Sequence, residues 1–170
     1  MKWVLLILGV LAAVVGIAAL IGVMLPLRHH GSRKARFRVS PDALYAVLAG
    51  PPDWRTGVQG FGALPEEGGR KRWWEQDTHG QKVTYELVED SPPRKLAVRI
   101  ADRGLPFGGT WTFEITPEGG GSELRISEDG EIYNVIFRVM ARFVFGYTGS
   151  IETYLKDLGA KFGEAVRIEA

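Results

Sequence analysis

The segment NVIFRVMARFVFGYTGSIETYLKDLGAKFGEAV, residues 134–166, decides the fold of this 170-residue chain. Its apolar residues recur mostly at steps of one, three or four, which is the pattern of one face of a long α-helix. The opposite face is charged and includes the pairs Glu152/Lys156 and Asp157/Lys161, whose i,i+4 order stabilises a helix. We therefore expect an amphipathic helix that buries one face against a large partner. Its apolar positions are Val135, Ile136, Val139, Met140, Phe143, Val144, Tyr147, Ile151, Leu155, Leu158, Phe162 and Val166.

Two glycines, Gly146 and Gly149, interrupt this segment midway. Each costs about 1 kcal/mol relative to alanine inside a helix. We expect a bend or local opening there, which separates a pocket-facing half, residues 134–145, from a packing half, residues 150–166. Phe137 and Phe145 lie off the main apolar stripe. A helix gripped by a curved sheet, or one resting near a membrane, could use both side chains.

The N-terminal run Trp3–Leu27 is apolar and carries no charge. At about 1.5 Å per residue, roughly 23 to 25 residues cross a hydrocarbon core of about 30 Å. A cleaved signal peptide is the alternative, but its apolar region usually has about 7 to 15 residues, and no clear small-x-small site closes the run before Pro26. We expect a retained transmembrane anchor over residues 1–28, followed by one domain over residues 29–170.

Positive charge is distributed unevenly around this run. Only Lys2 and the amino terminus precede it, so the positive-inside rule predicts a cytoplasmic domain and an external N-terminus. The basic residues that follow the run are Arg28, Arg33, Lys34, Arg36 and Arg38.

The middle of the chain alternates apolar and polar residues, which is typical of half-buried strands. His29–Ser32 is predicted to be a short linker, and a short helix is expected from Pro41, capped by Ser40, to about Leu48. Glycine and proline turns separate the strands by hairpin lengths, which indicates an antiparallel sheet and an α+β fold. The expected strands are 33–39, 58–64, 71–76, 81–89, 95–101, 110–116 and 123–130.

Three stretches and their order carry a family resemblance. They are VSPDALYAVL at 39–48, followed by Trp54; ELVEDSPPRKL at 86–96; and GTWTFEITPEGGGS at 109–122. Over about residues 32–164 the chain resembles the START-like superfamily, also called the Bet v 1-like or polyketide cyclase/dehydrase and lipid-transport (SRPBCC) fold. The resemblance implies a helix-grip fold, in which a curved antiparallel sheet of about seven strands wraps a long C-terminal helix around a hydrophobic cavity. Members bind lipids, sterols or polyketides, and some are cyclases; an N-terminal anchor departs from the commonest, soluble members.

Motifs for metal or phosphate chemistry are missing from the sequence. It has no cysteine and three histidines, and none of these forms a zinc-ligand spacing with a carboxylate. We expect no cofactor, no metal and no catalytic residue, and the net charge of +1 gives no indication of nucleic-acid binding. Glu128, Asp129 and Glu131 are interpreted as solvated acids close to a helix N-terminus.

The predicted cavity wall combines aromatic residues with one methionine, which suits an adaptable apolar pocket. Tyr85, Tyr133 and Tyr147 would be its polar groups, and each residue could equally be plain core. The candidate ligand-binding residues are Trp54, Trp74, Tyr85, Trp111, Phe113, Tyr133, Phe137, Met140, Phe143 and Tyr147.

Three functions remain open on the sequence. The favoured one is a non-catalytic, membrane-anchored module for a lipid or another apolar small molecule. An enzyme of the cyclase or dehydratase type would need a His, Asp or Glu inside the pocket with an oriented polar partner. A structural or interaction domain would instead fill the cavity with its own aromatic side chains.

Overall fold

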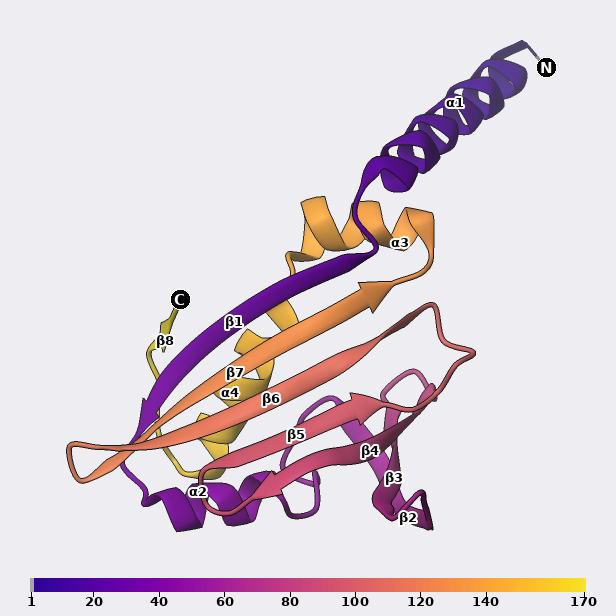
Figure 1. The fold of residues 1–170 in the computed structure, drawn as a ribbon. Helices are drawn as coiled ribbons and strands as arrows, with labels where there is room; N and C mark the ends of the chain where they lie inside the picture. The colour runs from indigo at the N-terminus through magenta and orange to yellow at the C-terminus, as the bar shows by residue number, and fades with distance from the viewer. Residues whose placement is uncertain (1) are drawn as a thin grey trace.

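The computed structural model describes residues 2–170, and within them one antiparallel sheet dominates the fold (Figure 1). Its eight strands run in the order β2-β3-β4-β5-β6-β7-β1-β8. The expected α+β fold with hairpin-connected strands is confirmed, and a two-residue edge strand, β8, is added to it. The strands are β1 Arg28–Phe37, β2 Val58–Glu67, β3 Arg70–Asp77, β4 Lys82–Ser91, β5 Lys95–Ile100, β6 Phe107–Glu118, β7 Gly121–Ile132 and β8 Ile168–Glu169.

One face of the sheet, which we call the inner face, is covered by the helix α4, Gly149–Lys161 (Figure 1). Ile151, Leu155 and Leu158 of α4 are fully buried, and they meet the fully buried Leu124 and Ile126 of β7 in one core cluster. Burying an aliphatic side chain contributes about 1.5 to 3 kcal/mol, so this cluster holds α4 on the sheet.

The short helix α2, Pro41–Leu48, begins as its sequence predicts. The Ser40 hydroxyl accepts a hydrogen bond from the Ala43 amide, and Pro41 occupies the first turn, where its missing N–H is not needed. Leu44 and Leu48 anchor the helix in the core.

The single long helix expected over residues 134–166 is corrected to three segments. They are α3, Val135–Met140; a π-helical turn η1, Ala141–Phe145; and α4. The predicted break at Gly146 is confirmed, because this residue has φ +72° and ψ 159°, a conformation that ends a helix and suits glycine. Beyond Lys161 the chain turns away through Gly163, with φ +67°, and reaches β8.

The expected linker at His29–Ser32 is also wrong, because these residues belong to β1 and pair with β7. The glycine in this stretch serves close packing instead of flexibility. A Cβ at Gly31 would lie 3.1 Å from the carbonyl oxygen of Tyr147 and 3.0 Å from the Thr148 side chain. The N-terminal helix therefore runs almost directly into the sheet.

The N-terminal helix α1, Lys2–Met24, projects away from the sheet, and its side chains are largely exposed (Figure 1). It is the one helix among residues 2–170 that is long and apolar enough to cross a membrane. Its last turn contacts α3, where a Cβ on Gly22 would lie 2.1 Å from the carbonyl oxygen of Val135. The segment α3–η1, expected to face a pocket, thus lies beside α1.

Candidate functional site

The inner face of the sheet is covered unevenly. The core residues of β6, β7 and β1 are buried beneath α4 and α2. On β3, β4 and β5, Leu96 and Glu75 are buried on the inner face, whereas five further inner-face side chains are half-buried. These side chains are apolar or aromatic, so they form an apolar surface that the protein itself does not fully cover. They are Trp73, Val83, Tyr85, Leu87 and Val98.

Tyr154 of α4 is the centre of an aromatic cluster next to this surface. Its ring centroid lies 5.1 Å from that of Trp54, 5.7 Å from that of Trp111 and 5.4 Å from that of Phe113. Such edge-on and tilted pairs each contribute about 0.5 to 1.5 kcal/mol beyond their buried area. Burial raises the pKa of Tyr154, so its hydroxyl stays protonated. The cluster fills the space between α4 and the middle of the sheet.

A partly buried ion pair borders the aromatic cluster. Arg55 Nη1 lies 2.6 Å from Glu75 Oε2, and the indole Nε1 of Trp73 donates to Glu75 Oε1 at 3.0 Å. The Arg55 guanidinium also lies 5.0 Å from the centroid of the Tyr154 ring, within the range of a cation–π contact. On the neighbouring strand, burial raises the pKa of Tyr85 to about 12. These groups place polar atoms within an otherwise apolar wall.

Glu128 of β7 lies on the inner face at the end of the sheet near α3. Burial raises the pKa of its carboxyl group, against hydrogen bonds from Trp111 and Ser150. The Ser150 hydroxyl donates to Glu128 Oε2 at 3.5 Å, and His29 Nε2 lies 3.7 Å from Glu128 Oε1. Burial lowers the pKa of His29, whose ring stacks on Tyr147 at 4.4 Å. A carboxyl group with a raised pKa next to a neutral imidazole can hold or transfer a proton.

The interpretation of Glu128 as a solvated acid is therefore wrong. Leu124, Ile126 and Glu128 alternate along β7, so the same face of the strand carries all three. Asp129 and Glu131, by contrast, lie on the outer face, and the Asp129 side chain is 73% exposed.

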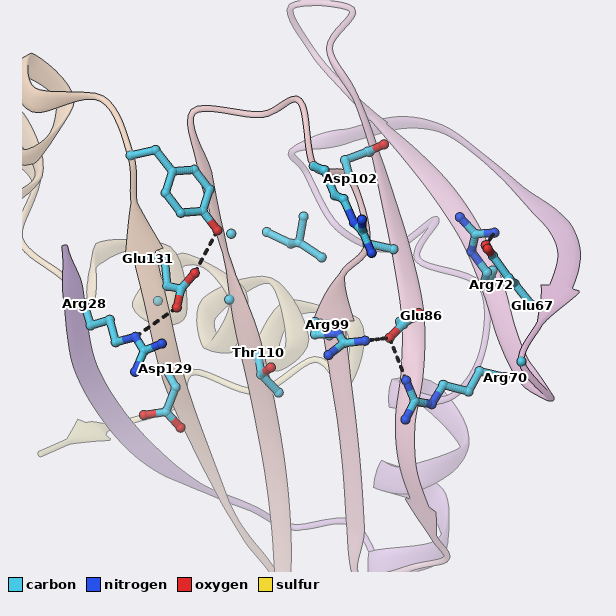
Figure 2. A pocket seen from close by; sticks show the side chains of 18 of the residues that line it. Arg28, Glu67, Arg70, Arg72, Glu86, Arg99, Asp102, Thr110, Asp129 and Glu131 are labelled. Carbon is cyan, nitrogen blue, oxygen red and sulfur yellow. Dashed lines mark hydrogen bonds and ion pairs between the residues drawn. The ribbon is translucent and has the colours of Figure 1, made fainter.

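A large open groove lies on the outer face of the sheet, opposite α4 (Figure 2). Its volume is about 1160 Å³. Charged pairs line it: Arg28 meets Glu131 at 3.0 Å, and Glu86 accepts from Arg99 and, at 3.1 Å, from Arg70. Because these charges neutralise one another in a solvent-exposed groove, it does not provide the apolar cavity that the sequence predicts.

The structure brings five of the predicted ligand-binding residues to the inner face. Phe113 is part of the buried core, and the other four are half-buried around it or towards α3. The five are Trp54, Tyr85, Trp111, Phe113 and Tyr147.

The other five lie elsewhere. Trp74 lies on the outer face, packed against Gly62 and beneath the Lys82 ammonium at 4.2 Å from its ring centroid. Tyr133 borders the outer groove, where its hydroxyl donates to Glu131 at 2.8 Å. The remaining three, Phe137, Met140 and Phe143, belong to α3 and η1.

Sequence reasoning missed several polar and aromatic residues of the inner face. Trp73 faces inward in place of Trp74, because strand alternation puts Trp73 and Glu75 on one side. The helical spacing of Ile151, Tyr154 and Leu158 would have identified Tyr154. The missed residues are His29, Arg55, Trp73, Glu75, Glu128 and Tyr154.

Residues 2–170 contain no group of three or more His, Asp or Glu side chains arranged to hold a metal ion. The polar atoms of the inner face are instead those of the Arg55–Glu75 pair, Tyr85, Glu128 and His29. They can bind the polar end of a mainly apolar molecule, and Glu128 can also exchange a proton.

Comparison with solved structures reveals the same fold at low sequence identity. Norcoclaurine synthase from Thalictrum flavum has a TM-score of 0.61 at 13% identity, covering 81% of this chain and 88% of that one. Protein MLL2253 from Mesorhizobium loti has a TM-score of 0.61 at 16% identity, covering 79% and 97%. The di-domain ARO/CYC StfQ from the steffimycin biosynthetic pathway has a TM-score of 0.62 at 16% identity, covering 79% and 50%.

The search of curated proteins found no match. The model of one family, described as polyketide cyclase/dehydrase and lipid transport, matches residues 28–162. This match contains all eight residues of α2, all of β1 to β7 and α4. The chain therefore belongs to the polyketide cyclase/dehydrase and lipid transport family.

Proposed function

We propose that this protein is a membrane-anchored module that binds an apolar small molecule or lipid on the inner face of its sheet. One observation carries the proposal: the apolar side chains of β3 to β5 are half-buried beside the Tyr154 cluster, although their strands belong to the wall of the fold. Binding sites for small molecules are mainly apolar walls with a few polar groups. The Arg55–Glu75 pair and Glu128 are polar groups of this kind.

The family supports an apolar ligand, since its description combines polyketide chemistry with lipid transport. The Tyr154 cluster is the argument for the competing function, a structural domain filled by its own aromatic side chains. The two functions differ in what the half-buried surface contacts. A bound ligand would cover the inner face around Val83, whereas in the structural domain that surface stays in contact with water.

Native mass spectrometry separates these two possibilities. The full chain is extracted from membranes into polymer-bounded lipid discs and compared with two variants on β4, Val83→Trp and Val88→Trp. Val83 is half-buried on the inner face, and Val88 is 41% exposed, so Val88→Trp controls for the added indole. We expect a co-purified molecule in the wild type and in Val88→Trp, and its loss in Val83→Trp. Retention by folded Val83→Trp, or an empty wild type, contradicts the proposal.

The membrane anchor of the proposal is α1, kept in the mature protein. The contact of Gly22 with Val135 supports retention, because a cleaved signal peptide has no need to pack against the folded domain. A cytoplasmic domain follows from the basic residues after α1. These side chains are paired in the folded domain, for example Arg28 with Glu131 and Lys34 with Glu123, but orientation is set during insertion, before β1 pairs with β7.

Cysteine labelling tests the orientation, because the natural chain has no cysteine. The variant Lys156→Cys introduces a thiol on the exposed side of α4. A membrane-impermeant maleimide is expected to label it only after the cells are permeabilised. Labelling in intact cells would reverse the proposed orientation.

A second candidate function is acid–base catalysis on the bound molecule. It is favoured by Glu128, whose side chain is 18% exposed, has a raised pKa and lies next to His29. A buried carboxyl group with an oriented polar partner is the arrangement that a cyclase or dehydratase needs. The test compares the co-purified molecule from the wild type with that from Glu128→Gln. A chemically changed product in the wild type and unreacted precursor in the variant support catalysis; identical molecules contradict it.

A further inference from the structure

An exposed group of large apolar side chains lies on α3 and η1, next to the end of α1. We call it the membrane-proximal patch and define it as Ile136, Phe137, Phe143, Val144 and Phe145. The last three side chains are 66%, 62% and 59% exposed. Contiguous apolar patches of this kind are rare on soluble monomers and mark contact with another apolar surface.

The hydrogen bonds of Arg138 connect this patch to α1. Arg138 Nη1 donates to the carbonyl oxygens of Gly22 at 3.2 Å and of Leu25 at 3.4 Å. In a continuing helix the Gly22 carbonyl would accept from residue 26, but Pro26 has no N–H. Arg138 therefore replaces the missing donor, and its positive charge lies at the helix C-terminus, where the helix dipole favours it.

The junction between α1 and the sheet leaves α3 little freedom to move relative to α1. The Ile132 amide donates to the Leu27 carbonyl at 2.9 Å, and β1 begins at the next residue. Gly22 contacts Val135 two residues before α1 ends at Met24. At about 1.5 Å of rise per residue, Gly22 lies roughly 3 Å inside the end of α1. The start of α3 thus lies level with the C-terminal end of α1.

We propose that α3 and η1 lie in the interface of a lipid bilayer, with the membrane-proximal patch buried among the lipids beside α1. This inference rests on the proposed insertion of α1 in the membrane. Amphipathic segments in this position bury their apolar face about 5 to 10 Å deep. The exposed Arg142 then reaches the lipid phosphates. Gly146 connects η1 to Tyr147, whose ring stacks on His29, so the His29–Glu128 end of the inner face lies close to the bilayer, where an apolar ligand would enter.

Electron paramagnetic resonance on single spin-labelled cysteines tests the patch in the full chain, reconstituted in phosphatidylcholine/phosphatidylglycerol vesicles. The cysteine-free sequence permits the four variants Phe143→Cys, Phe145→Cys, Val14→Cys and Lys156→Cys. Val14 lies within α1 and Lys156 on the exposed side of α4, so they are the lipid and water references. Accessibility to oxygen, which concentrates in lipid, is compared with accessibility to a water-soluble nickel chelate.

We expect residues 143 and 145 to be accessible to oxygen and protected from nickel, as residue 14 is, whereas residue 156 is accessible to nickel. Nickel accessibility at 143 and 145 with residue 14 in lipid overturns the interfacial segment and leaves the anchor intact. Nickel accessibility at residue 14 as well contradicts the anchor itself. Protection of 143 and 145 from both reagents also overturns the inference, because it indicates a protein contact, such as a second copy of the chain.

Discussion

Arg138 caps the C-terminus of α1, because its Nη1 atom donates a hydrogen bond to the carbonyl oxygen of Gly22, 116 positions earlier in the chain. The same side chain donates through Nε to the Ile132 carbonyl at 2.7 Å, at the end of β7. A single guanidinium therefore joins the proposed anchor, the last long strand and α3. Movement of the anchor is expected to be transmitted to the domain without a flexible linker.

The contact between α1 and α3 depends on the absence of a side chain at Gly22. In Gly22→Ala the new methyl group would lie 2.1 Å from the Val135 carbonyl oxygen, so the two helices must separate. Overpacking of this kind costs about 1 to 3 kcal/mol, which corresponds to a roughly fivefold or greater increase in hydrogen exchange of α3 amides. Hydrogen exchange with mass spectrometry over residues 135–145 measures the change.

Gly16→Ala is the matched control, because a Cβ at Gly16 meets no heavy atom within 4 Å and both glycines lie in α1. We expect exchange in the control to equal that of the wild type. Equal exchange in both variants would show that the contact between α1 and α3 does not hold the segment in place.

The Arg55–Glu75 pair is expected to show strong energetic coupling. Glu75 is largely buried, whereas the Arg55 side chain is 27% exposed, so we expect Glu75→Gln to lower the free energy of unfolding by about 1 to 3 kcal/mol, less than for a fully buried pair. Arg55→Leu should cost a similar amount, and the double variant less than the sum. Denaturant unfolding of the full chain in detergent, followed by tryptophan fluorescence, measures each value.

A surface pair provides the control for this cycle. Arg36 and Glu118 lie 2.8 Å apart, with side chains 65% and 39% exposed, so Glu118→Gln should change stability by less than about 0.5 kcal/mol. Additive single effects at Arg55 and Glu75 would indicate that the two charges are each stabilised separately.

Glu128 should make stability depend on pH. Its pKa in the folded protein is raised above 4.5 by burial, so the folded state retains a proton that the unfolded state releases. This proton makes its full contribution to the free energy of unfolding below pH 4.5, and the contribution is lost as the pH rises through the higher pKa of the folded state. The amide of Glu128→Gln does not titrate, so this variant does not lose stability in this way. Its free energy of unfolding should therefore rise relative to that of the wild type as the pH increases from 4.5 to neutrality.

His29 acts in the opposite direction, because burial lowers its pKa below 6.5 and its stabilising effect is lost as the pH falls. The comparison is therefore made by denaturant unfolding at each pH of two proteins that both carry His29→Gln, one with Glu128 and one with Glu128→Gln, because this removes the titration of His29. A pH-independent difference between the two proteins would contradict the raised pKa of Glu128.

The local sequence predicted most of the fold, because its signals act over short distances. The Ser40–Pro41 cap began α2 where expected, and strand alternation located the strands β2 to β7 to within about three residues, whereas β1 begins five residues before its predicted start. Gly146 likewise marked the break before α4. Caps, alternation and breaking glycines depend on a few neighbouring residues, so they can be read before the chain is folded.

The errors concern relationships between distant segments. Whether Trp73 or Trp74 faces α4 depends on the pairing of β3 with β4, which puts Trp73 opposite Tyr85. The burial of Glu128 depends on α4 crossing above it. The position of α3 depends on its contact with Gly22, more than 100 residues away in the chain. Periodicity within a segment does not contain this information.

Tyr154 should be the most sensitive position of the aromatic cluster. It is 8% exposed, and removal of its ring in Tyr154→Ala leaves Trp54, Trp111 and Phe113 around a void. Such substitutions cost about 3 to 5 kcal/mol, and the apolar void that remains can bind a small aromatic molecule. Tyr154→Phe keeps the ring and should cost less than about 1.5 kcal/mol.

Denaturant unfolding of both variants, with and without added benzene, measures the two effects. Benzene should raise the unfolding midpoint of Tyr154→Ala most, because the deleted ring leaves an enclosed apolar void that the wild type and Tyr154→Phe fill. Thr153→Ala, at the exposed neighbouring position, is the control for the change to alanine. If Tyr154→Ala unfolds at the wild-type midpoint, the ring is dispensable and the space beneath α4 is open to a ligand. A lower midpoint that benzene restores shows instead that the aromatic side chains themselves hold α4 on the sheet.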